Sequence, residues 1–361
     1  MDTQTPSAAT GTRGLTAAVV LFVGALLTFT GLTWDVQWHE DVGPDTFFTL
    51  PHLFLYAGSA VSGLASLTAV LMTTAARRAG QVPDPTVGGV PVGVFGRVFT
   101  APLGYLVSGS GAAAFLLYGL WDQWWHGIYG FDAVIDSPPH VGLLLSVAMT
   151  LVGTVIVFAA SRDRLWGRLG VFAAFGLLAG FTTITAVAFQ DLSDTVDSMH
   201  VAMAWFVSLI LFSGAGFIRK GGIAVAVALG VIQAISWWFS PWATRRYADA
   251  VDLPVRDYIS GVPTMPALMP MALILIALLT YPLLATTARW APPVAGGLAG
   301  VALVVLQDFQ DALVYGIPAP AVDDLLPTAL VAAVLGLLAG HLGTRFGRML
   351  RLAAGARPEG A

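Results

Sequence analysis

Runs of apolar residues, separated by short polar connections, recur from one end of the chain to the other. A run of about 20 apolar residues is long enough to cross a hydrocarbon core roughly 30 Å thick. Ten such runs lie near residues 14–34, 51–75, 101–123, 138–160, 167–189, 198–218, 222–241, 264–286, 291–313 and 327–348. The pattern predicts an all-α integral membrane protein with about ten transmembrane helices.

The stretches between and beyond these runs are short. Residues 1–12 are polar and are predicted to be a disordered N-terminus. The first run lacks a clear small-residue cleavage site, so we interpret it as a retained helix and not as a signal peptide. Residues 77–100 are rich in proline and glycine and are predicted to form a loop, and residues 351–361 a cytoplasmic tail.

Composition agrees with this fold class and limits the chemistry. Of the 361 residues, 57% are hydrophobic and 11% are charged, whereas about 25% of the residues in soluble domains are charged. The chain has no cysteine, which excludes disulfides, iron–sulfur clusters and thiolate metal sites. It contains no Walker loop, G-x-G-x-x-G unit, serine triad or basic nucleic-acid-binding stripe, so no nucleic-acid partner is predicted.

The basic residues predict the orientation in the membrane. When the connections are placed on alternate sides, 14 of the 17 lysines and arginines fall on one side, and only Arg245, Arg246 and Arg256 fall on the other. The positive-inside rule then places both termini in the cytoplasm. Seventeen of the 21 acidic residues fall outside, which gives the outer side a net charge of −14 and the inner side +10. An outer face of this charge attracts cations or a basic soluble partner protein.

With alternating sidedness, the ten spans form five outward-pointing helical hairpins that we interpret as degenerate repeats. In four of them the first helix ends near an aspartate: Asp35, Asp122, Asp191 and Asp308. The second helix tends to open with proline and then histidine. Residues 13–160 are therefore predicted to be a duplicated pair of hairpins with an intact motif, and residues 161–350 three further, degenerate hairpins.

Two stretches in the first two hairpins are near copies. Residues 34–52 read W-D-V-Q-W-H-E-D-V-G-P-D-T-F-F-T-L-P-H, and residues 121–140 read W-D-Q-W-W-H-G-I-Y-G-F-D-A-V-I-D-S-P-P-H. Each copy has an Asp, a His four residues later, and a second His 13 or 14 residues after the first; the members are Asp35, His39, His52, Asp122, His126 and His140. Residues four apart share a helix face, and the loop returns the second His to the start of the next helix. Two imidazoles and a carboxylate then converge, a donor set that suits copper, zinc, iron or manganese.

The charge of these stretches supports a metal site. An ionised aspartate near hydrocarbon is costly unless it is paired, and neither stretch contains a lysine or arginine. The alternative is that Asp and His cap helix ends at the water interface, where tryptophans such as Trp34, Trp38 and Trp121 form an aromatic belt. We adopt the belt for the tryptophans and the metal site for the Asp/His sets, because capping needs no histidine at a fixed position.

The first copy resembles the copper-site motif in the C subunit of particulate methane and ammonia monooxygenases. The resemblance rests on D-x-x-W-H, an Asp six residues after the His, a Phe, and a His 13 residues after the first; these are Asp35, Trp38, His39, Asp45, Phe48 and His52. The second copy has one more residue before His140 and no Phe at the matching place. The resemblance implies copper bound by one Asp and two His in each copy, and it implies partner subunits.

If the two hairpins pack face to face, the six ligands surround one pocket with room for one or two copper ions. Asp45 and Asp132 would then orient the imidazole rings from outside the ligand set. Weaker candidates are Asp191, Asp194 and His200, which are spaced by multiples of three near the third hairpin's turn. They extend the site, line a path for cations, or form a solvated acidic turn.

Three functions are compatible with these features. In the first, a copper site on the outer side of the cell membrane activates O2 against a small apolar substrate from the lipid bilayer, as a monooxygenase-like oxidoreductase. In the second, the protein takes up, stores or delivers copper without catalysis. In the third, it is a non-catalytic membrane subunit whose acidic outer surface docks a partner.

Overall fold

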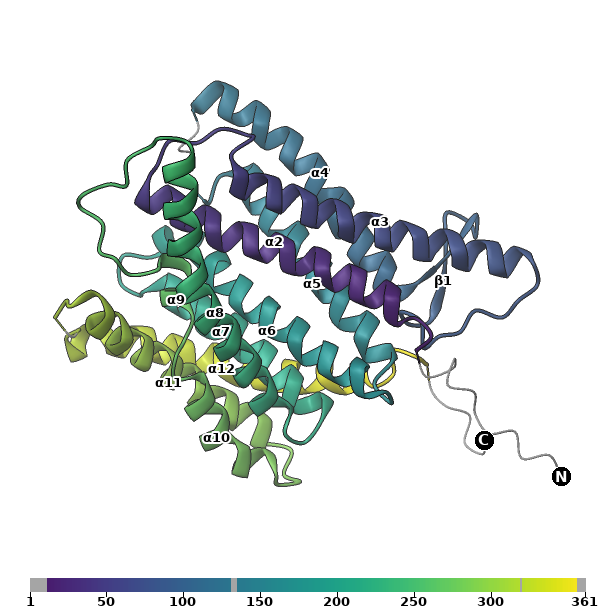
Figure 1. The fold of residues 1–361 in the computed structure, drawn as a ribbon. Helices are drawn as coiled ribbons and strands as arrows, with labels where there is room; N and C mark the ends of the chain where they lie inside the picture. The colour runs from purple at the N-terminus through teal and green to yellow at the C-terminus, as the bar shows by residue number, and fades with distance from the viewer. Residues whose placement is uncertain (1–11, 131–134, 319, 356–361) are drawn as a thin grey trace.

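The computed structural model of the protein describes residues 12–130, 135–318 and 320–355 (Figure 1). The predicted disordered N-terminus and most of the predicted cytoplasmic tail lie outside the described residues. In chain order the helices are α2 (Leu15–Asp41), α3 (Leu50–Arg78), α4 (Leu103–Tyr129), α5 (Pro138–Ala160), α6 (Leu165–Val187), α7 (Ser198–Phe217), α8 (Gly221–Ala250), α9 (Thr264–Leu268), α10 (Leu273–Leu284), α11 (Ala291–Tyr315) and α12 (Val322–Leu350).

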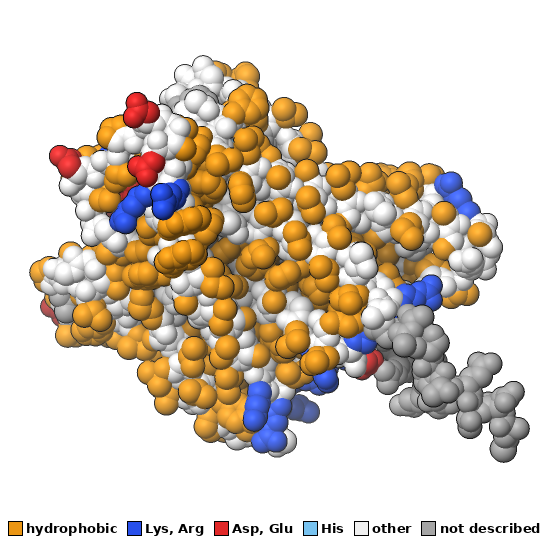
Figure 2. Space-filling view, in the orientation of Figure 1, with side chains coloured by type: hydrophobic (Ala, Val, Ile, Leu, Met, Phe, Trp, Pro, Cys, Tyr) orange, Lys and Arg blue, Asp and Glu red, His pale blue; other side chains and the backbone are white. Residues whose placement is uncertain are grey.

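The apolar runs of the sequence form membrane-length helices. Over the described residues, ten helical spans are long and apolar enough to cross a membrane, with α9 and α10 counted as one. The predicted multi-pass helical membrane protein is thus confirmed. Figure 2 shows a broad belt of hydrophobic side chains between two ends that carry the charged groups of this face. Several helices extend past their apolar run, and α2 continues to Asp41, beyond the predicted end near residue 34.

Small residues bring consecutive helices into close contact. A Cβ on Gly58 of α3 would lie 2.3 Å from the backbone nitrogen of Thr28 on α2, and one on Gly153 of α5 would lie 2.3 Å from that of Ser108 on α4. No side chain fits at either place. Close approach through small residues is a common way to pack helices in a bilayer, where lipid tails are as apolar as the helices themselves. The two helix pairs that carry the duplicated motif are therefore tightly packed.

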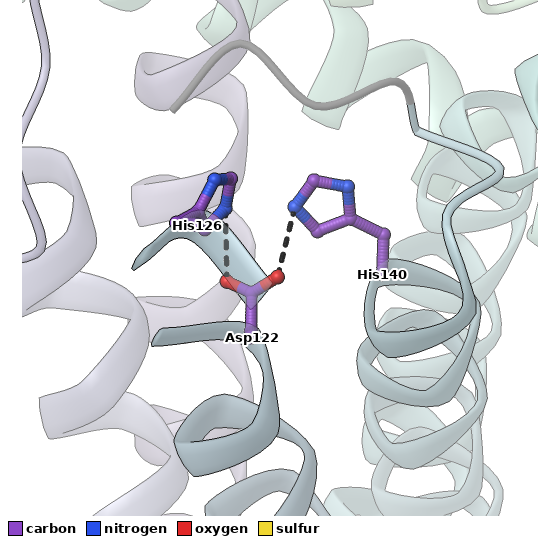
Figure 3. Close-up of side chains that lie close together, drawn as sticks. All are labelled: Asp122, His126 and His140. Carbon is purple, nitrogen blue, oxygen red and sulfur yellow. Dashed lines mark ion pairs between the residues drawn. The ribbon is translucent and has the colours of Figure 1, made fainter. Parts of the chain in front are cut away.

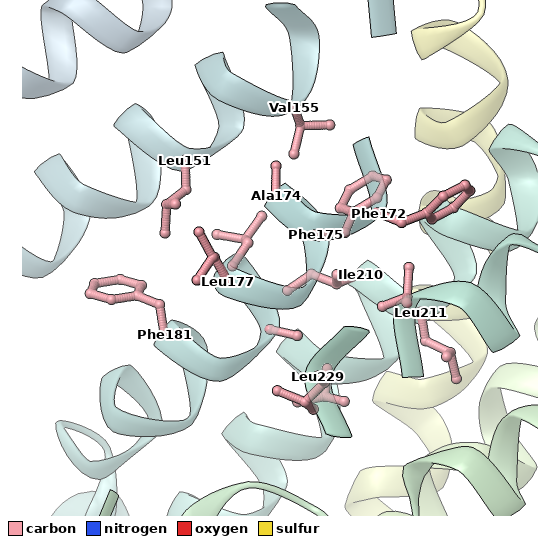
Figure 4. Close-up of a cluster of buried hydrophobic side chains, with 14 of the residues drawn as sticks. Leu151, Val155, Phe172, Ala174, Phe175, Leu177, Phe181, Ile210, Leu211 and Leu229 are labelled. Carbon is pink, nitrogen blue, oxygen red and sulfur yellow. The ribbon is translucent and has the colours of Figure 1, made fainter. Parts of the chain in front are cut away.

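The helices α6 and α7 are the most enclosed spans, with 78% of their apolar window buried inside the protein. Figure 4 shows side chains of α6, including Phe175, Leu177 and Phe181, packed against residues from α5, α7 and α8. By contrast, α3 and α4 expose large apolar side chains such as Leu64, Leu117 and Leu120. Exposed apolar side chains of this kind are expected of spans that meet lipid at the edge of a helix bundle.

One predicted span is interrupted. Instead of one helix over 264–286, the chain forms α9, a non-helical connection through Pro270, and α10. The break interrupts the regular pattern of helical hydrogen bonds to the backbone carbonyls, and such groups must be satisfied inside a membrane. Three glutamine side chains donate to them. Gln233 Nε2 lies 3.0 Å from Pro266 O and 2.7 Å from Met269 O. Gln307 and Gln310 both donate to Ala267 O, at 3.2 and 2.7 Å.

Residues 77–100 contain more structure than the predicted loop. β1 (Pro91–Val94) pairs antiparallel with β2 (Phe99–Pro102), and Val94 lies opposite Phe99. The turn between the strands uses positive φ angles at Phe95, Gly96 and Arg97. The strands contain residues that favour β structure, such as Val92, Val94 and Phe99, but four-residue strands are too short to predict from pattern alone.

Candidate metal centre

Each copy of the motif places its residues on two adjacent helices. Asp35 and His39 lie on α2, and Asp122 and His126 on α4. The second histidine of each copy lies in the first turn of the next helix, directly after a proline, at His52 of α3 and His140 of α5. Proline is tolerated in the first turn because its missing N–H would have no helical partner there. The proline thus fixes the start of the helix and the position of the histidine.

In the second copy, one carboxylate lies between two imidazoles (Figure 3). Asp122 Oδ1 is 3.2 Å from His140 Nε2, and Asp122 Oδ2 is 3.4 Å from His126 Nε2. The two rings have their centroids 5.5 Å apart. The ligand atoms of the three residues all lie within 4.8 Å of one another, close enough to hold one metal ion. We call Asp122, His126 and His140 the second cluster.

The first copy brings together a different set. His52 Nε2 is 3.0 Å from Asp35 Oδ1 and 3.5 Å from Asp45 Oδ2, and these three residues form the group within 4.8 Å. His39 Nε2 lies 3.1 Å from Asp45 Oδ2 at the edge of the group, and its side chain is 39% exposed. Asp45 therefore stands among the candidate ligands, where the sequence predicted an outer role. We call Asp35, Asp45 and His52, with His39 beside them, the first cluster; Asp132, the matching acid of the second copy, lies outside the described residues.

A short, well-bonded loop positions Asp45. Trp38 Nε1 donates to Pro44 O at 2.9 Å, Thr49 Oγ1 donates to Asp45 Oδ1 at 2.9 Å, and Thr46 N donates to Thr49 Oγ1 at 2.8 Å. Trp38 is itself buried against Tyr247 of α8, with ring centroids 4.8 Å apart. The interfacial belt predicted for the tryptophans is wrong for Trp34 and Trp38, which are buried, whereas Trp121 and Trp124 are exposed.

Backbone carbonyls fix the proton on two of the histidines. His52 Nδ1 lies 3.0 Å from Thr46 O, and His126 Nδ1 lies 2.7 Å from Gly130 O. A carbonyl oxygen only accepts, so in both rings Nδ1–H donates and, in the neutral imidazole, Nε2 presents a lone pair. Metal-binding histidines characteristically have their other ring nitrogen held in this way. In both clusters, therefore, it is the Nε2 atoms that face the carboxylates.

The carboxylates are left without ordinary partners. Asp35 Oδ1 and Asp122 Oδ1 are buried and form no hydrogen bond, although a histidine Nε2 lies 3.0 and 3.2 Å away. Over the described residues no lysine or arginine lies within 4.0 Å of these carboxylates; Arg256 Nη1 reaches α2 but donates to the carbonyls of His39 and Glu40. Carboxylate oxygens and imidazole nitrogens thus converge with no lysine or arginine between them, an arrangement that a bound cation would stabilise.

Asp45 also shows the electrostatic strain of this arrangement. Burial raises the pKa of Asp45, and the nearby charge of Asp35 raises it further. His52 and the hydrogen bond from Thr49 act in the opposite direction but do not cancel the effect of burial. Burial of the Asp45 carboxyl thus disfavours its charged form, and a cation next to it would favour that form.

One cavity of about 460 Å³ adjoins both clusters. Its acidic and histidine lining comprises Asp35, His39, Glu40, Asp45, His52, Asp122, His126 and His140. All six residues identified from the repeat thus face the same space. Most of the remaining lining is apolar and comes from α2, α3, α4, α5 and α6: Leu32, Val36, Leu55, Phe115, Leu143, Leu144, Val147, Phe181, Ile184 and Val187.

The weaker candidates separate in the structure. Asp191 and Asp194 are exposed near η1 (Gln190–Leu192), and neither belongs to a group of converging ligands. His200 is buried at the start of α7 and lies 2.8 Å from Asp308 of α11. The sequence pattern predicts a role for both His200 and Asp308, but it assigns them to different hairpins. Their proximity depends on the packing of α7 against α11, which the sequence pattern does not specify.

Comparisons of the chain with protein-family models, with curated proteins and with solved structures find no match. The functional interpretation therefore rests on the geometry described above and on the motif resemblance.

Proposed function

We propose that this protein binds copper at the two Asp/His clusters, on the outer side of the cell membrane, and there activates O2 against a small apolar substrate. The observation that carries the proposal is the single cavity lined by both clusters and otherwise by apolar side chains. An apolar pocket with a few converging polar groups is the usual form of a small-molecule site. The resemblance of Asp35, His39 and His52 to the monooxygenase C-subunit motif supports copper as the ion.

The chain's own residues have defined parts in this proposal. Asp35, Asp45 and His52 would hold one ion and Asp122, His126 and His140 the other, with His39 beside the first. Bound copper would supply the redox chemistry. Thr46 O and Gly130 O hold the Nδ1 protons of His52 and His126 and keep Nε2 available. Apolar residues such as Phe115, Leu144 and Phe181 bind a substrate without polar groups and exclude water.

Copper handling without catalysis is the second candidate, and one observation favours it. The His39 side chain is 39% exposed while its Nε2 lies 3.1 Å from the buried Asp45, so His39 would form the opening through which ions reach the first cluster. The charge distribution predicted from the sequence, with an acidic outer face, would concentrate cations at this opening. A non-catalytic subunit docked through that face remains the third candidate from sequence.

Metal analysis of the purified protein tests the proposal. After reconstitution with copper in lipid nanodiscs, we expect one to two equivalents of copper with a Cu(II) resonance showing nitrogen ligands. The double variant His52→Ala/His140→Ala is expected to lose this copper, whereas His341→Ala, a histidine on α12 away from the cavity, retains it. Less than one equivalent in the wild-type protein, or full retention in the double variant, refutes copper binding.

A second pair of measurements separates the two leading functions. Copper-dependent O2 consumption with a short hydrocarbon or ammonia supports the oxidoreductase. Accumulation of labelled copper inside proteoliposomes without O2 consumption supports copper handling and refutes the catalytic proposal.

A further inference from the structure

A third cluster of titratable side chains lies outside the cavity. It contains His200 on α7, Asp197 directly before α7, and Asp308 and Asp311 on α11. None of the four lines the cavity that adjoins the first and second clusters. We call these four residues the third cluster.

His200 is the centre of the third cluster. It is 95% buried, at 5% relative exposure, and each ring nitrogen faces carboxylate oxygen. Nδ1 lies 2.8 Å from Asp308 Oδ1 and 3.0 Å from Asp197 Oδ2. Despite these distances neither ring nitrogen forms a hydrogen bond, so the buried imidazole is aimed at the carboxylates without a donor–acceptor geometry that would satisfy it.

We infer that His200, Asp197 and Asp308 form a separate binding site for a divalent cation that accepts oxygen ligands, such as Mn²⁺ or Zn²⁺. One atom from each of the three residues lies within 4.8 Å of the others, close enough to bind a single ion. One imidazole with two carboxylates is a harder donor set than the two imidazoles of the second cluster, and it favours zinc, manganese or iron(II).

A further carboxylate, that of Asp311, lies at the ring nitrogen of His200 that faces away from the proposed ion. Asp311 Oδ2 lies 3.2 Å from His200 Nε2, and Gln307 Nε2 donates to Asp311 Oδ1 at 3.0 Å. A carboxylate behind a metal-binding histidine, itself held by a further hydrogen bond, is the common way to orient such a ring. With the ion bound at Nδ1, the proton of the imidazole lies on Nε2, and Asp311 would then be the positioning residue that accepts it.

The remaining contacts hold the ligands in place and leave one side open. Asp197 caps α7, because its Oδ1 accepts from the backbone N–H of His200 at 2.9 Å, and its own N–H donates to Thr328 Oγ1 at 3.0 Å. Its side chain is 42% exposed, whereas that of Asp308 is 16% exposed. A cation can therefore reach His200 from the surface past Asp197. Over the described residues no lysine or arginine forms an ion pair with these carboxylates.

Binding of Mn²⁺ tests this site independently of the cavity. The experiment uses the full-length protein with the double substitution His52→Ala/His140→Ala, which disables the first and second clusters. Bound Mn²⁺ is counted from the loss of the free-ion EPR signal, and Zn²⁺ competition is followed in the same titration. We expect one Mn²⁺ per chain, displaced by one Zn²⁺. The outcome of this titration does not depend on whether the cavity binds copper.

Substitutions then locate the ion. Asp308→Asn keeps the side-chain shape and is expected to weaken Mn²⁺ binding at least about 100-fold. This exceeds the usual loss when a residue that only hydrogen-bonds to a metal ligand is replaced. Asp311→Asn is expected to weaken it about tenfold, and the exposed Asp194→Asn, a matched control at the same turn, less than about twofold. His200→Ala should abolish binding in protein that remains monodisperse.

Two outcomes overturn the inference. One is the absence of stoichiometric Mn²⁺ or Zn²⁺ binding to the cavity-disabled protein. The other is binding that persists unchanged in Asp308→Asn, which would place the ion elsewhere. If His200→Ala lowers the melting temperature but no ion binds to its parent, the third cluster is a structural ion-pair network and the inference is wrong.

Discussion

Asp122 lies between two histidines, whereas Asp35 shares His52 with a second carboxylate. The two clusters thus start from the same residues at nearly the same spacing and arrive at different donor sets. The second cluster offers two imidazoles and one carboxylate, and the first offers two carboxylates with one imidazole at the centre and His39 beside them. Copper favours the imidazole-rich set, and oxygen donors favour harder ions. Two stretches of nearly the same sequence therefore bring together different sets of side chains.

The helix contacts beneath the clusters differ in a complementary way. In the first hairpin Gly31 of α2 faces α3 close to Phe54, where a Cβ would lie 3.0 Å from the Phe54 Cβ. At the aligned positions of the second hairpin, the large residue is Tyr118 on α4 and the glycine is Gly142 on α5, where a Cβ would lie 2.1 Å from the Tyr118 ring. The large and small partners have exchanged helices. In both hairpins a glycine thus allows a larger residue of the partner helix to approach closely.

The largest expected difference comes from removing one aspartate in each copy. Asp122→Asn removes the single carboxylate of the second cluster and is expected to weaken copper binding there at least about 100-fold. This exceeds the usual loss when a residue that only hydrogen-bonds to a metal ligand is replaced. Asp35→Asn leaves Asp45 in the first cluster and is expected to cost about tenfold, or 1.4 kcal/mol. Each loss is measured by chelator competition with the other cluster disabled. His52→Ala disables the first cluster when Asp122→Asn is tested, and His140→Ala disables the second cluster when Asp35→Asn is tested. Equal losses would contradict the difference between the donor sets.

A smaller contrast is expected between the first histidine of each copy. His126 Nε2 lies 3.4 Å from Asp122, inside the second cluster, while His39 Nε2 lies 3.1 Å from Asp45 at the edge of the first cluster. His126→Ala should therefore remove the nitrogen superhyperfine pattern of one imidazole and weaken copper binding about 30-fold. His39→Ala should weaken copper binding only about threefold, because His39 lies at the edge of its cluster. If His39→Ala is the more damaging of the two, His39 is a direct ligand and the first cluster rearranges on binding.

The helix packing gives a third, matched pair. Gly58→Ala and Gly153→Ala each place a Cβ 2.3 Å from a backbone nitrogen of the partner helix. Each is expected to destabilise the protein by about 1–3 kcal/mol through overpacking. Gly58→Ala should affect copper binding at the first cluster alone, and Gly153→Ala at the second. Gly230→Ala on α8, where the nearest side chain lies at 3.5 Å, is the control and should change neither melting temperature nor binding.

The smallest effect concerns pH. Because the pKa of Asp45 is raised in the folded protein, its contribution to stability is fully present below the unfolded value of 3.8 and is lost as pH rises through the folded value. Without metal at neutral pH, Asp45→Asn removes this cost and should raise the melting temperature by about 2 °C. With copper bound the sign should reverse, because the ion then stabilises the carboxylate. A variant that destabilises the metal-free protein at neutral pH would contradict the assignment.

Much of this could be predicted from the sequence. Apolar runs specify membrane spans because length and hydropathy alone decide them, and the duplicated Asp/His spacing identified every histidine of the first and second clusters. The ligand role of Asp45 could not be predicted, since it depends on the Trp38–Pro44 hydrogen bond and on the Thr49 contact within a loop. The burial of Trp34 and Trp38 was also missed, because it requires Tyr247 of α8 to pack across α2.

The third cluster shows the same limit at longer range. His200 and Asp308 carry the repeat's Pro/Met–His and helix-end Asp signals, but they meet across two hairpins. Only the packing of α7 with α11 brings them together. The break between α9 and α10 did leave a signal in Pro266 and Pro270, together with the glutamines of α11, since buried amides beside prolines indicate carbonyls that need donors.

The short helix α9 has a consequence for communication within the molecule. At its start, Thr264 lines the cavity and donates its backbone N–H to Gln37 Oε1 of α2 at 3.1 Å. At its other end, the carbonyl of Ala267 accepts from Gln307, the same amide that holds Asp311 behind His200. A shift of α9 must therefore break or move contacts at both places together. One short helix thus joins the wall of the cavity to the carboxylate that lies next to His200, through hydrogen bonds near both of its ends.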